Sequence, residues 1–489
     1  MKKTVLLALA ALVTLTSCKK DLIDDFLNNG NDDKDKIKFK DYSVTPNFLD
    51  VKPEFSNLKV TTLLSSEDVL PESPDFVYGS MADGAGILKN SDGTFSIINN
   101  IEADYAVARI NLDKTFKPVS GEHILNAVAT AFTAQCSGSL ITPREHGFGP
   151  LYLSGGEWGG SSKGVFLTDP YKAAADAGSF EMLDAWGQWS TENAVVIGKK
   201  AYPGKTVAFI GDDHSDNEIP SGQLGMYVGN RGDVYGGQLY GLRVIDPDVD
   251  FEMDMDEGKS YPMEFVPLNE TNIDLLDAEA KAKGVMGFSR LEDIDWRRGS
   301  AKNNREIYFC VTGRKKDGLV GKGTLYGRIY KVVLNDTNPA GVGTITCILD
   351  GDNLSGKAKA FHSPDNILVT KDNVYIQEDP NGYPDTADKD HYAYLYQYNL
   401  KSKKLKVVLE CDQDAAEAAG YPSNGRTWEI TGMIDISEEL DKDKTFLLIT
   451  QNHGWEPADG SAFTDPTANP DVANSRKEGS MMYVIRGLK

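Results

Sequence analysis

The chain has 489 residues, far more than one small core needs. Its 73 acidic residues against 51 lysines and arginines give a formal net charge of −22. This surplus argues against nucleic acid as the main partner, because a phosphate backbone is bound by a basic face. A hydrophobic fraction of 40% excludes wholesale disorder, and 47 glycines with 21 tyrosines favour a turn-rich β protein. With 6 histidines, any metal site has to rely mostly on oxygen ligands.

Residues 1–17 have the pattern of a bacterial export signal. A charged start precedes the apolar run Val5–Val13, which is too short to span a bilayer. The segment Leu15–Cys18 resembles the lipobox of lipoproteins, in which the chain is cut before the cysteine and lipid is attached to its thiol. We therefore predict lipidation of Cys18, a flexible charged tether over 18–45, and anchoring to the cell envelope, at the outer membrane, through lipid alone. The alternative is an ordinary secretory peptide with an incidental cysteine.

Short runs of strand-forming residues follow one another between Gly, Asn and Asp turns from about residue 58 onward. They predict strands at Phe76–Tyr78, Val207–Ile210, Gly225–Val228, Leu239–Val244, Glu306–Val311, Thr324–Leu334, Asn366–Val369, Asn373–Gln377, Tyr392–Asn399, Leu405–Leu409, Phe446–Thr450 and Met481–Ile485. Helical patterns are few, and we expect helices at 122–133 and 274–283, with a weaker one at 170–182.

The C-terminal half repeats one arrangement. A strand with a polar tip precedes a strand such as Gly327–Val332 (GRIYKV) or Tyr394–Leu400 (YLYQYNL), and an outer strand and a loop follow. Propeller blades have this pattern. We predict an all-β fold, a single six-bladed β-propeller over 46–489 that is monomeric. Roughly 75 residues per blade exceed the ~40–50 of regular repeats, so inserted loops carry the excess. The alternative is a large two-sheet sandwich with an appended domain.

The cysteines beyond Cys18 are widely spaced. None forms a CxxC pair, which excludes a zinc ribbon or a thioredoxin-type motif, and the spacing permits one disulfide without requiring it. Cys310 and Cys347 lie in apolar runs and are expected to be buried core thiols. Cys136 lies in the polar segment Gln135–Ser139, where burial is harder to explain.

Carboxylates stand at several points where an apolar run gives way to a loop. In a propeller, such points from different blades meet around one channel mouth, where like charges repel or protonate unless cations neutralise them. Hard cations such as Ca²⁺ take about six to eight oxygen ligands, whereas an added thiolate suits a transition metal better. For any one residue a solvated loop acid is the simpler interpretation, so only the joint pattern indicates a metal site. The carboxylates are Glu102, Glu157, Asp212, Asp213, Glu292, Glu378 and Glu429.

An ordered set of motifs resembles the PhoX-type alkaline phosphatases. Residues 136–143 (CSGSLITP) and 149–157 (GPLYLSGGE) are similar to that family's cysteine signature, and Arg290–Ile294 is similar to its RPED-type motif. Each motif alone is weak, but their order over residues 60–455 is fairly specific. The further matching segments are 100–102, 307–312, 327–330, 363–367, 377–379, 429–435 and 447–453.

The resemblance implies a propeller that holds Fe³⁺ and Ca²⁺ at its channel mouth and hydrolyses small phosphate monoesters. By motif, Cys136 would be the thiolate ligand of iron, and Arg144 and Arg290 would hold the phosphate. No side chain is assigned as the nucleophile, because the family uses a metal-held oxide or hydroxide. The carboxylate ligands would be Glu102, Glu157, Glu292 and Glu378, with a looser match for Asp212, Asp213 and Glu429.

The chain also departs from the family's pattern. Gly156–Trp158 has one acidic position fewer than the signature, Thr142–Gly147 rewrites its TPWG element, and the lipoprotein signal replaces the twin-arginine signal common in the family. One alternative is a non-catalytic surface propeller with structural calcium that binds a ligand or a glycan. Another is a phytase or phosphodiesterase, which needs no thiolate, so Cys136 separates the alternatives. The sequence has no HExxH helix and no P-loop spacing.

Overall fold

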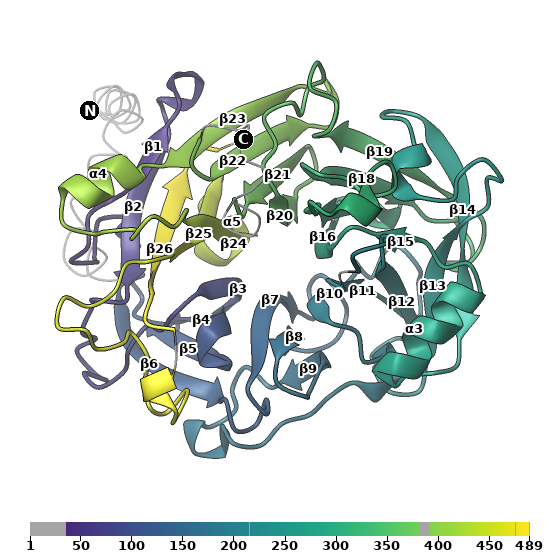
Figure 1. Ribbon diagram of the computed structural model, residues 1–489. Coiled ribbons are helices and arrows are strands. Elements are labelled where there is room, and N and C mark those ends of the chain that lie inside the picture. The colour runs from purple at the N-terminus through teal and green to yellow at the C-terminus, as the bar shows by residue number, and fades with distance from the viewer. Residues whose placement is uncertain (1–35, 215, 381–390, 475, 489) are drawn as a thin grey trace, which may run out of the picture.

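The computed structural model describes residues 36–214, 216–380, 391–474 and 476–488. Its sheets are arranged as a ring, in which strands from the two ends of the chain lie side by side (Figure 1). The export signal and Cys18 lie outside the described residues, so lipidation stays a prediction. Within the described part, no helix combines the length and the apolar character that crossing a membrane requires.

Four of the five hydrogen-bonded sheets have three to five strands. The first contains, in order, β3 (Ala82–Lys89), β4 (Phe95–Ile101), β5 (Ala106–Leu112) and β6 (Pro118–Leu125). The second contains β7 (Thr133–Ile141), β8 (Leu151–Gly159) and β9 (Gly164–Thr168). The third runs β1 (Leu49–Val51), β23 (Leu405–Cys411), β22 (Tyr394–Asn399), β21 (Asn373–Glu378) and β20 (Pro364–Val369). The fourth runs β2 (Lys59–Ser65), β26 (Gly479–Arg486), β25 (Thr445–Asn452) and β24 (Glu429–Asp435).

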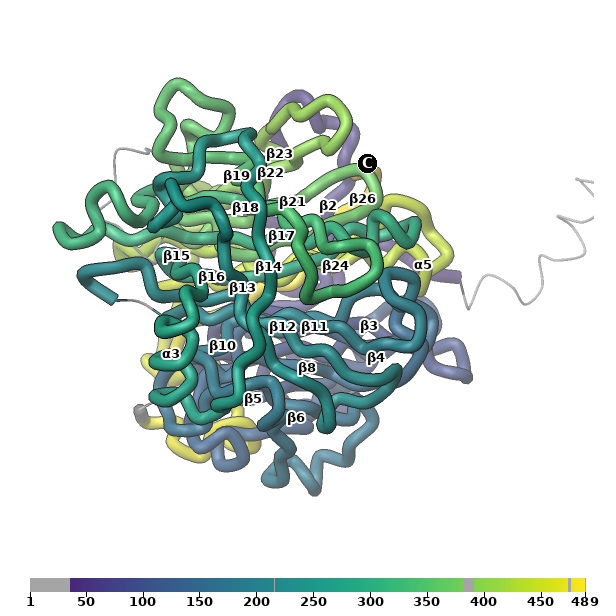
Figure 2. Tube along the Cα trace, turned by 90° about the vertical axis from the view of Figure 1, so that its right-hand side faces the viewer, coloured from purple at the N-terminus to yellow at the C-terminus, as the bar shows by residue number. Residues whose placement is uncertain are grey.

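The fifth sheet consists of two meanders joined at their outer edges, where β14 pairs with β19. Figure 2 views the molecule from the side on which these outer strands lie. The strand order is β10 (Thr191–Val196), β11 (Lys205–Asp212), β12 (Gly222–Asn230), β13 (Gln238–Val244), β14 (Ser260–Leu268), β19 (Gly343–Asp350), β18 (Arg328–Val333), β17 (Glu306–Val311) and β16 (Leu291–Trp296), with β15 (Gly287–Phe288) paired to β12.

The strands β3, β7, β10, β16, β20 and β24 form the inside of the ring, and each contacts the next, with β24 returning to β3. The two ends of the chain help to close the ring, because β2 pairs with β26 and β1 pairs with β23. The predicted all-β propeller is therefore confirmed. The hydrogen-bonded sheets number five rather than the six expected, because two meanders share one sheet.

Helices are short, as expected, but their positions agree only in part. The helix expected at 274–283 is α3, and Asn272 caps its first turn by accepting a hydrogen bond from the Asp274 N–H. The helix expected at 122–133 is wrong, because Glu122 and His123 pair with β5 and this pairing overrides helix propensity. The segment 170–182 contains only one 3₁₀ turn, and Phe76–Tyr78 is irregular rather than a strand. The helices are α3 (Ile273–Ala282), α4 (Gln413–Ala418), α5 (Ser437–Leu440), and the 3₁₀ turns η1 (Pro53–Phe55), η2 (Glu102–Asp104), η3 (Ala174–Asp176), η4 (Asp184–Trp186), η5 (Glu252–Asp254), η6 (Asn303–Arg305), η7 (Asp317–Leu319) and η9 (Val472–Asn474).

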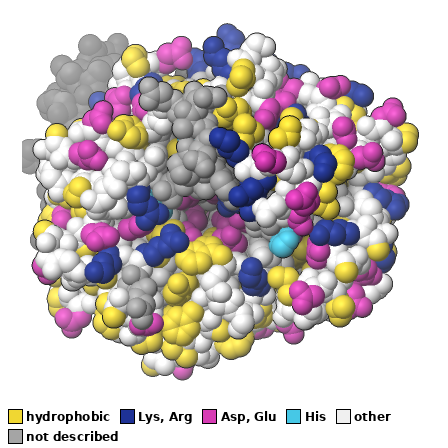
Figure 3. Space-filling model, viewed as in Figure 1, with side chains coloured by type: hydrophobic (Ala, Val, Ile, Leu, Met, Phe, Trp, Pro, Cys, Tyr) yellow, Lys and Arg dark blue, Asp and Glu magenta, His cyan; other side chains and the backbone are white. Residues whose placement is uncertain are grey.

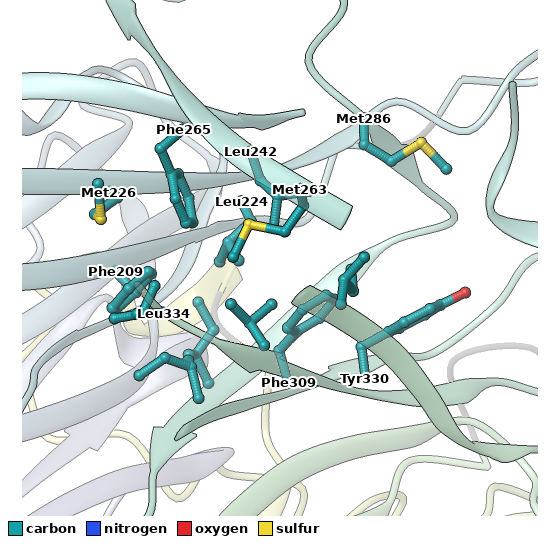
Figure 4. Close-up of a cluster of buried hydrophobic side chains, with 14 of the residues drawn as sticks. Phe209, Leu224, Met226, Leu242, Met263, Phe265, Met286, Phe309, Tyr330 and Leu334 are labelled. Atoms are coloured by element: carbon teal, nitrogen blue, oxygen red, sulfur yellow. The ribbon is translucent and has the colours of Figure 1, made fainter. Parts of the chain in front are cut away.

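A hydrophobic core holds the two meanders of the joined sheet together (Figure 4). Phe209 from β11, Phe265 from β14 and Phe309 from β17 are buried in it, and Phe309 stacks on Tyr330 of β18 at 5.2 Å between ring centroids. Burying each such ring contributes roughly 2–3 kcal/mol. The core therefore fixes the joined sheet, whose end strands β10 and β16 lie next to each other on the ring.

Candidate metal centre

Acidic side chains gather in a pocket of about 250 Å³, and such side chains are visible in the central hollow of the ring (Figure 3). Eight carboxylates, one thiol, one imidazole and two guanidinium groups line this acidic pocket, together with Met81 and Trp158. The charged and metal-binding side chains are Asp83, Glu102, Cys136, Glu157, Glu192, Arg290, Glu292, Asp365, Asp379, Glu429, His453 and Arg476.

These side chains converge because of the hairpin geometry. Each innermost strand is followed by an antiparallel strand, so the start of the first lies beside the end of the second. In the first sheet, for example, Ala82 pairs with Ile101, and the residues that follow them, Asp83 and Glu102, both line the pocket. The same position holds Cys136 with Glu157 and Asp365 with Asp379, and also Glu192 with Asp213, which adjoins the pocket. In β24, Glu429 pairs with Gln451, and His453 lies two residues further on, while Glu292 stands alone at the start of β16.

Every innermost strand has an irregular register at or beside its pocket residue. A bulge adds a residue to one strand, bends it and changes the direction of its side chains. Glu292 therefore lines the acidic pocket while the next residue, Asp293, lines the channel beyond it. The shifts lie between Ala82 and Ala85, Gln135 and Gly138, Thr191 and Ala194, Leu291 and Ile294, Pro364 and Ile367, and Ile430 and Met433.

Three groups of side chains in the pocket are close enough to share an ion. Within each group the ligand atoms lie within 4.8 Å of one another. The Cys136 thiol donates to Glu157 Oε2 at 2.9 Å. His453 Nε2 lies 3.5 Å from Glu429 Oε2. The groups are Glu102, Cys136 and Glu157; Glu192, Glu292 and Asp365; and Asp379, Glu429 and His453.

Hydrogen bonds from neighbouring residues hold several of these carboxylates in position. Glu102 accepts one hydrogen bond from Trp158 Nε1 and one from Gln451 Nε2, both at 2.7 Å. Arg290 donates to Asp213 Oδ2 at 2.8 Å, and the same nitrogen lies 2.8 Å from Glu292 Oε1. The ligand-bearing side chains are thus oriented by the protein in the way that metal ligands usually are.

Burial raises the pKa of the pocket's acids, and their mutual repulsion raises it further. Desolvation is the largest cause for Glu157, Glu192 and Glu429, and neighbouring carboxylates add to it. Desolvation also raises the pKa of the Cys136 thiol, with Glu157 as the next cause. Two arginines cannot neutralise eight carboxylates and a thiolate, so the ionised pocket requires cations. The mixture of carboxylates, a thiol and an imidazole is a donor set for hard cations and for a transition metal.

The structure brings most of the predicted site residues together. Glu102, Cys136, Glu157, Glu292, Glu429 and Arg290 all line the acidic pocket. Asp213 adjoins it through its hydrogen bond to Arg290. Although its segment is polar, Cys136 is buried in β7, and it is a free thiol, like Cys310, Cys347 and Cys411.

Two of the predicted carboxylates, Glu378 and Asp212, do not line the pocket. Glu378 accepts hydrogen bonds from the His362 N–H at 2.8 Å and from the Tyr396 hydroxyl at 3.0 Å, so it braces neighbouring segments instead. Asp212 accepts from the Ser190 N–H at 3.0 Å. In both cases the next residue along the chain is directed to the pocket, because successive side chains of a strand alternate in direction.

Arg144 lies in a different part of the channel. It lines a second cavity, of about 460 Å³, which shares no lining residue with the acidic pocket. There its guanidinium pairs with Glu438 at 2.9 Å and with Glu439 at 2.8 Å. This position and these partners leave it no role in holding a phosphate in the acidic pocket.

Several pocket residues were not among the predicted ligands. Four innermost strands share a sequence pattern, in which an acid followed by Gly, Asn or Asp stands at the start of an apolar strand. This pattern would have identified three of the missed residues, Asp83, Glu192 and Asp365. The pattern occurs at Asp83–Gly84, Glu192–Asn193, Glu292–Asp293 and Asp365–Asn366. The residues missed are Asp83, Glu192, Asp365, Asp379, His453 and Arg476.

Comparison with known proteins identifies a family and a solved structure with a similar fold. A family model described as alkaline phosphatase PhoX matches residues 165–452. The structure of Pseudomonas fluorescens PhoX in complex with vanadate, a transition state analogue, is similar with a TM-score of 0.63 and 14% identity, covering 92% of this chain and 98% of that one. At this identity the likeness shows the fold alone.

Two further solved structures are much less similar. The PQQ-bound aldose sugar dehydrogenase of Streptomyces coelicolor has a TM-score of 0.36 and 9% identity, covering 88% of this chain and 98% of that one. The GH93 α-L-arabinofuranosidase of Fusarium graminearum with arabinobiose has a TM-score of 0.39 and 10% identity, covering 87% and 98%. Such low scores support no argument about function. No curated protein matches the chain.

Proposed function

The chain belongs to the PhoX alkaline phosphatase family, and we propose that it is a metal-dependent phosphatase that hydrolyses phosphate monoesters in the acidic pocket. The observation that supports this most is the convergence of eight carboxylates with Cys136 and His453 in one pocket. A structural calcium site needs no thiol, so Cys136 favours the enzyme over a calcium-braced binding propeller.

The residues fit Fe³⁺ and Ca²⁺ as the cations. Cys136, Glu102 and Glu157 would hold the iron, because a thiolate ligand suits a transition metal. Glu192, Glu292 and Asp365 offer only carboxylate oxygens, which suits Ca²⁺, and the third group adds an imidazole nitrogen. When bound, these ions would supply the positive charge that neutralises phosphoryl oxygens.

The chain's own side chains would position the site and bind the substrate. Trp158 and Gln451 keep Glu102 from turning away, because each donates to a different oxygen of its carboxylate. Arg290 holds Asp213 and Glu292 together and brings a positive charge to the pocket wall, where it would orient an entering phosphate. His453 is fixed by its second ring nitrogen, which lies 2.8 Å from Glu478 Oε2.

We also propose six blades in one propeller over 46–489, with the joined sheet counted as two blades. The closed ring of six innermost strands supports this count. We further propose a monomeric lipoprotein of the cell envelope at the outer membrane; the lipobox-like segment Leu15–Cys18 supports the lipid anchor. Substitution Cys18→Ser should then release the protein from the membrane fraction and remove the mass of the lipid.

Metal content tests the proposed centre. Protein purified without a chelator should contain iron and calcium by elemental mass spectrometry, and Cys136→Ala should lose the iron while it keeps calcium. Cys310→Ala, which alters a buried thiol outside the pocket, is the matched control and should keep both metals. The metal-loaded protein should release phosphate from monoesters. Calcium without iron, unchanged in Cys136→Ala, would instead support the non-catalytic propeller that binds a ligand or a glycan.

A further inference from the structure

An aromatic ledge runs outward from the acidic pocket and consists of Trp158, Tyr105 and Phe132. Trp158 lines the pocket and donates a hydrogen bond to Glu102 Oε1. The Tyr105 ring packs edge-on against both neighbours, with centroids 5.9 Å apart and interplanar angles of 72° to Trp158 and 71° to Phe132. The ledge therefore leads from a carboxylate of the proposed metal centre to the solvent.

Phe132 combines an exposed aromatic side chain with a strained, left-handed backbone, and both features cost stability. It is 40% exposed, and its backbone is left-handed with φ of 58°, as is that of Ala131 with φ of 51°. A bulky residue rarely takes this conformation, because its Cβ approaches the backbone too closely. The turn is nevertheless held firmly: the Phe132 N–H donates to the Ala127 carbonyl and the Gly160 N–H to the Phe132 carbonyl, both at 2.8 Å. Strain maintained in this way is a feature of ligand sites.

Arg476 adds a cation to the same side of the pocket. Its guanidinium carbon lies 4.9 Å from the centroid of the Trp158 ring, and its side chain is exposed. Among the described residues, Arg476 has no ion-pair partner, whereas Arg290 pairs with Asp213 and Glu292. A planar cation beside an aromatic ring can attract an anion and stack on a second ring.

Hydrophobic side chains are visible beside the central hollow in Figure 3. We propose that the ledge is the leaving-group subsite and that it selects phosphate monoesters whose alcohol carries a planar aromatic ring. This inference rests on the proposed function. With the phosphate in the pocket, the ring would lie against Tyr105 and Phe132, next to Arg476. In the reaction, water oxygen bonds to phosphorus, the bond from phosphorus to the ester oxygen breaks, and the leaving alcohol takes a proton from the water.

Binding of two phosphonates tests the ledge without any hydrolysis. Benzylphosphonate and cyclohexylmethylphosphonate have similar sizes and the same charge, so their affinity ratio in isothermal calorimetry isolates the contribution of the aromatic ring. For the metal-loaded protein we expect benzylphosphonate to bind about three- to tenfold more tightly. The ratio should fall toward one in Phe132→Leu. It should not change in Phe180→Leu, which alters a phenylalanine that is 55% exposed and lies outside the pocket lining.

Hydrolysis separates failure of the ledge from failure of the proposed function. Benzyl phosphate should have the higher kcat/KM against cyclohexylmethyl phosphate, and Phe132→Leu should remove this preference. Phe180→Leu should keep the preference and leave methyl phosphate hydrolysis unchanged. Equal affinities of the wild-type protein for the two phosphonates would overturn the ledge even if every ester is hydrolysed. A binding preference without hydrolysis of any ester would count against the phosphatase and keep the ledge. If neither phosphonate binds, both proposals fail.

Discussion

Trp158 holds the pocket carboxylate Glu102 in position through a hydrogen bond from its indole N–H. Its indole N–H is 2.7 Å from Glu102 Oε1, and its ring lies between Arg476 and Tyr105. A carboxylate that binds a metal keeps its orientation only if its other contacts hold it, and such outer contacts contribute measurably to metal affinity.

We predict that Trp158→Phe weakens metal binding by about 10- to 100-fold, because the ring is kept but the donor to Glu102 is lost. Competition with a chromophoric chelator measures the affinity. Trp296→Phe is the control, since the Trp296 indole N–H is buried with no hydrogen-bond partner in the described part and the ring lines the second cavity. Equal metal affinity in the two variants would show that the hydrogen bond to Glu102 does not support the centre.

At the scale of elements, the innermost strands approach one another too closely for most side chains. A Cβ built on Gly84 of β3 would lie 2.0 Å from the Gly138 nitrogen of β7, and one on Gly432 of β24 would lie 2.5 Å from the Asp83 oxygen of β3. Glycine is therefore required where these three strands meet, and the pocket residues at the adjacent bulges depend on that close approach.

Substitution Gly84→Ala should destabilise the fold by about 2–3 kcal/mol or more, because the added methyl group meets backbone rather than a flexible side chain. Thermal unfolding in the presence of calcium measures the loss. Gly178→Ala should change the melting temperature little, since nothing lies within 4 Å of the added Cβ and the residue has no left-handed φ. A Gly84→Ala protein as stable as wild type would mean that β3 and β7 can move apart without cost.

The sequence predicts strands better than it predicts the direction of their last side chains. Apolar runs placed most strands correctly, because burial alone decides them. Glu378 was chosen although Asp379 lines the pocket, because successive side chains of a strand alternate in direction and composition does not show which of two adjacent acids faces inward. The helix expected at 122–133 was wrong for a related reason. The start of that segment pairs with β5, and a local sequence pattern does not show which strand a segment will pair with.

For the whole molecule, closing the ring concentrates negative charge. Each innermost strand brings an acid or Cys136 to the pocket, in a chain whose net charge is already −22. Pairing of β2 with β26 and of β1 with β23 must hold the ring against this repulsion. Metal binding would remove the repulsion, so stability and metal content should be coupled.

Removal of the metals should therefore lower the melting temperature more at pH 8 than at pH 5. Burial raises the pKa of Glu157, Glu192 and Glu292 above the ordinary 4.5. In the metal-free protein, the folded state then keeps protons that the unfolded chain has lost. Each such acid contributes its full stability below pH 4.5 and loses it, by up to roughly 1.4 kcal/mol per pH unit, as the pH rises toward its folded pKa.

The measurement is thermal unfolding at both pH values, after the chelator and the metals are removed together by gel filtration, with and without added Ca²⁺ and iron. Added metal should restore most of the lost stability at pH 8 and little at pH 5, where protons compete for the same oxygens. Equal losses at the two pH values would mean that the pocket's carboxylates do not govern stability. The metals would then act through Cys136 and His453, whose contributions Cys136→Ala and His453→Gln would separate.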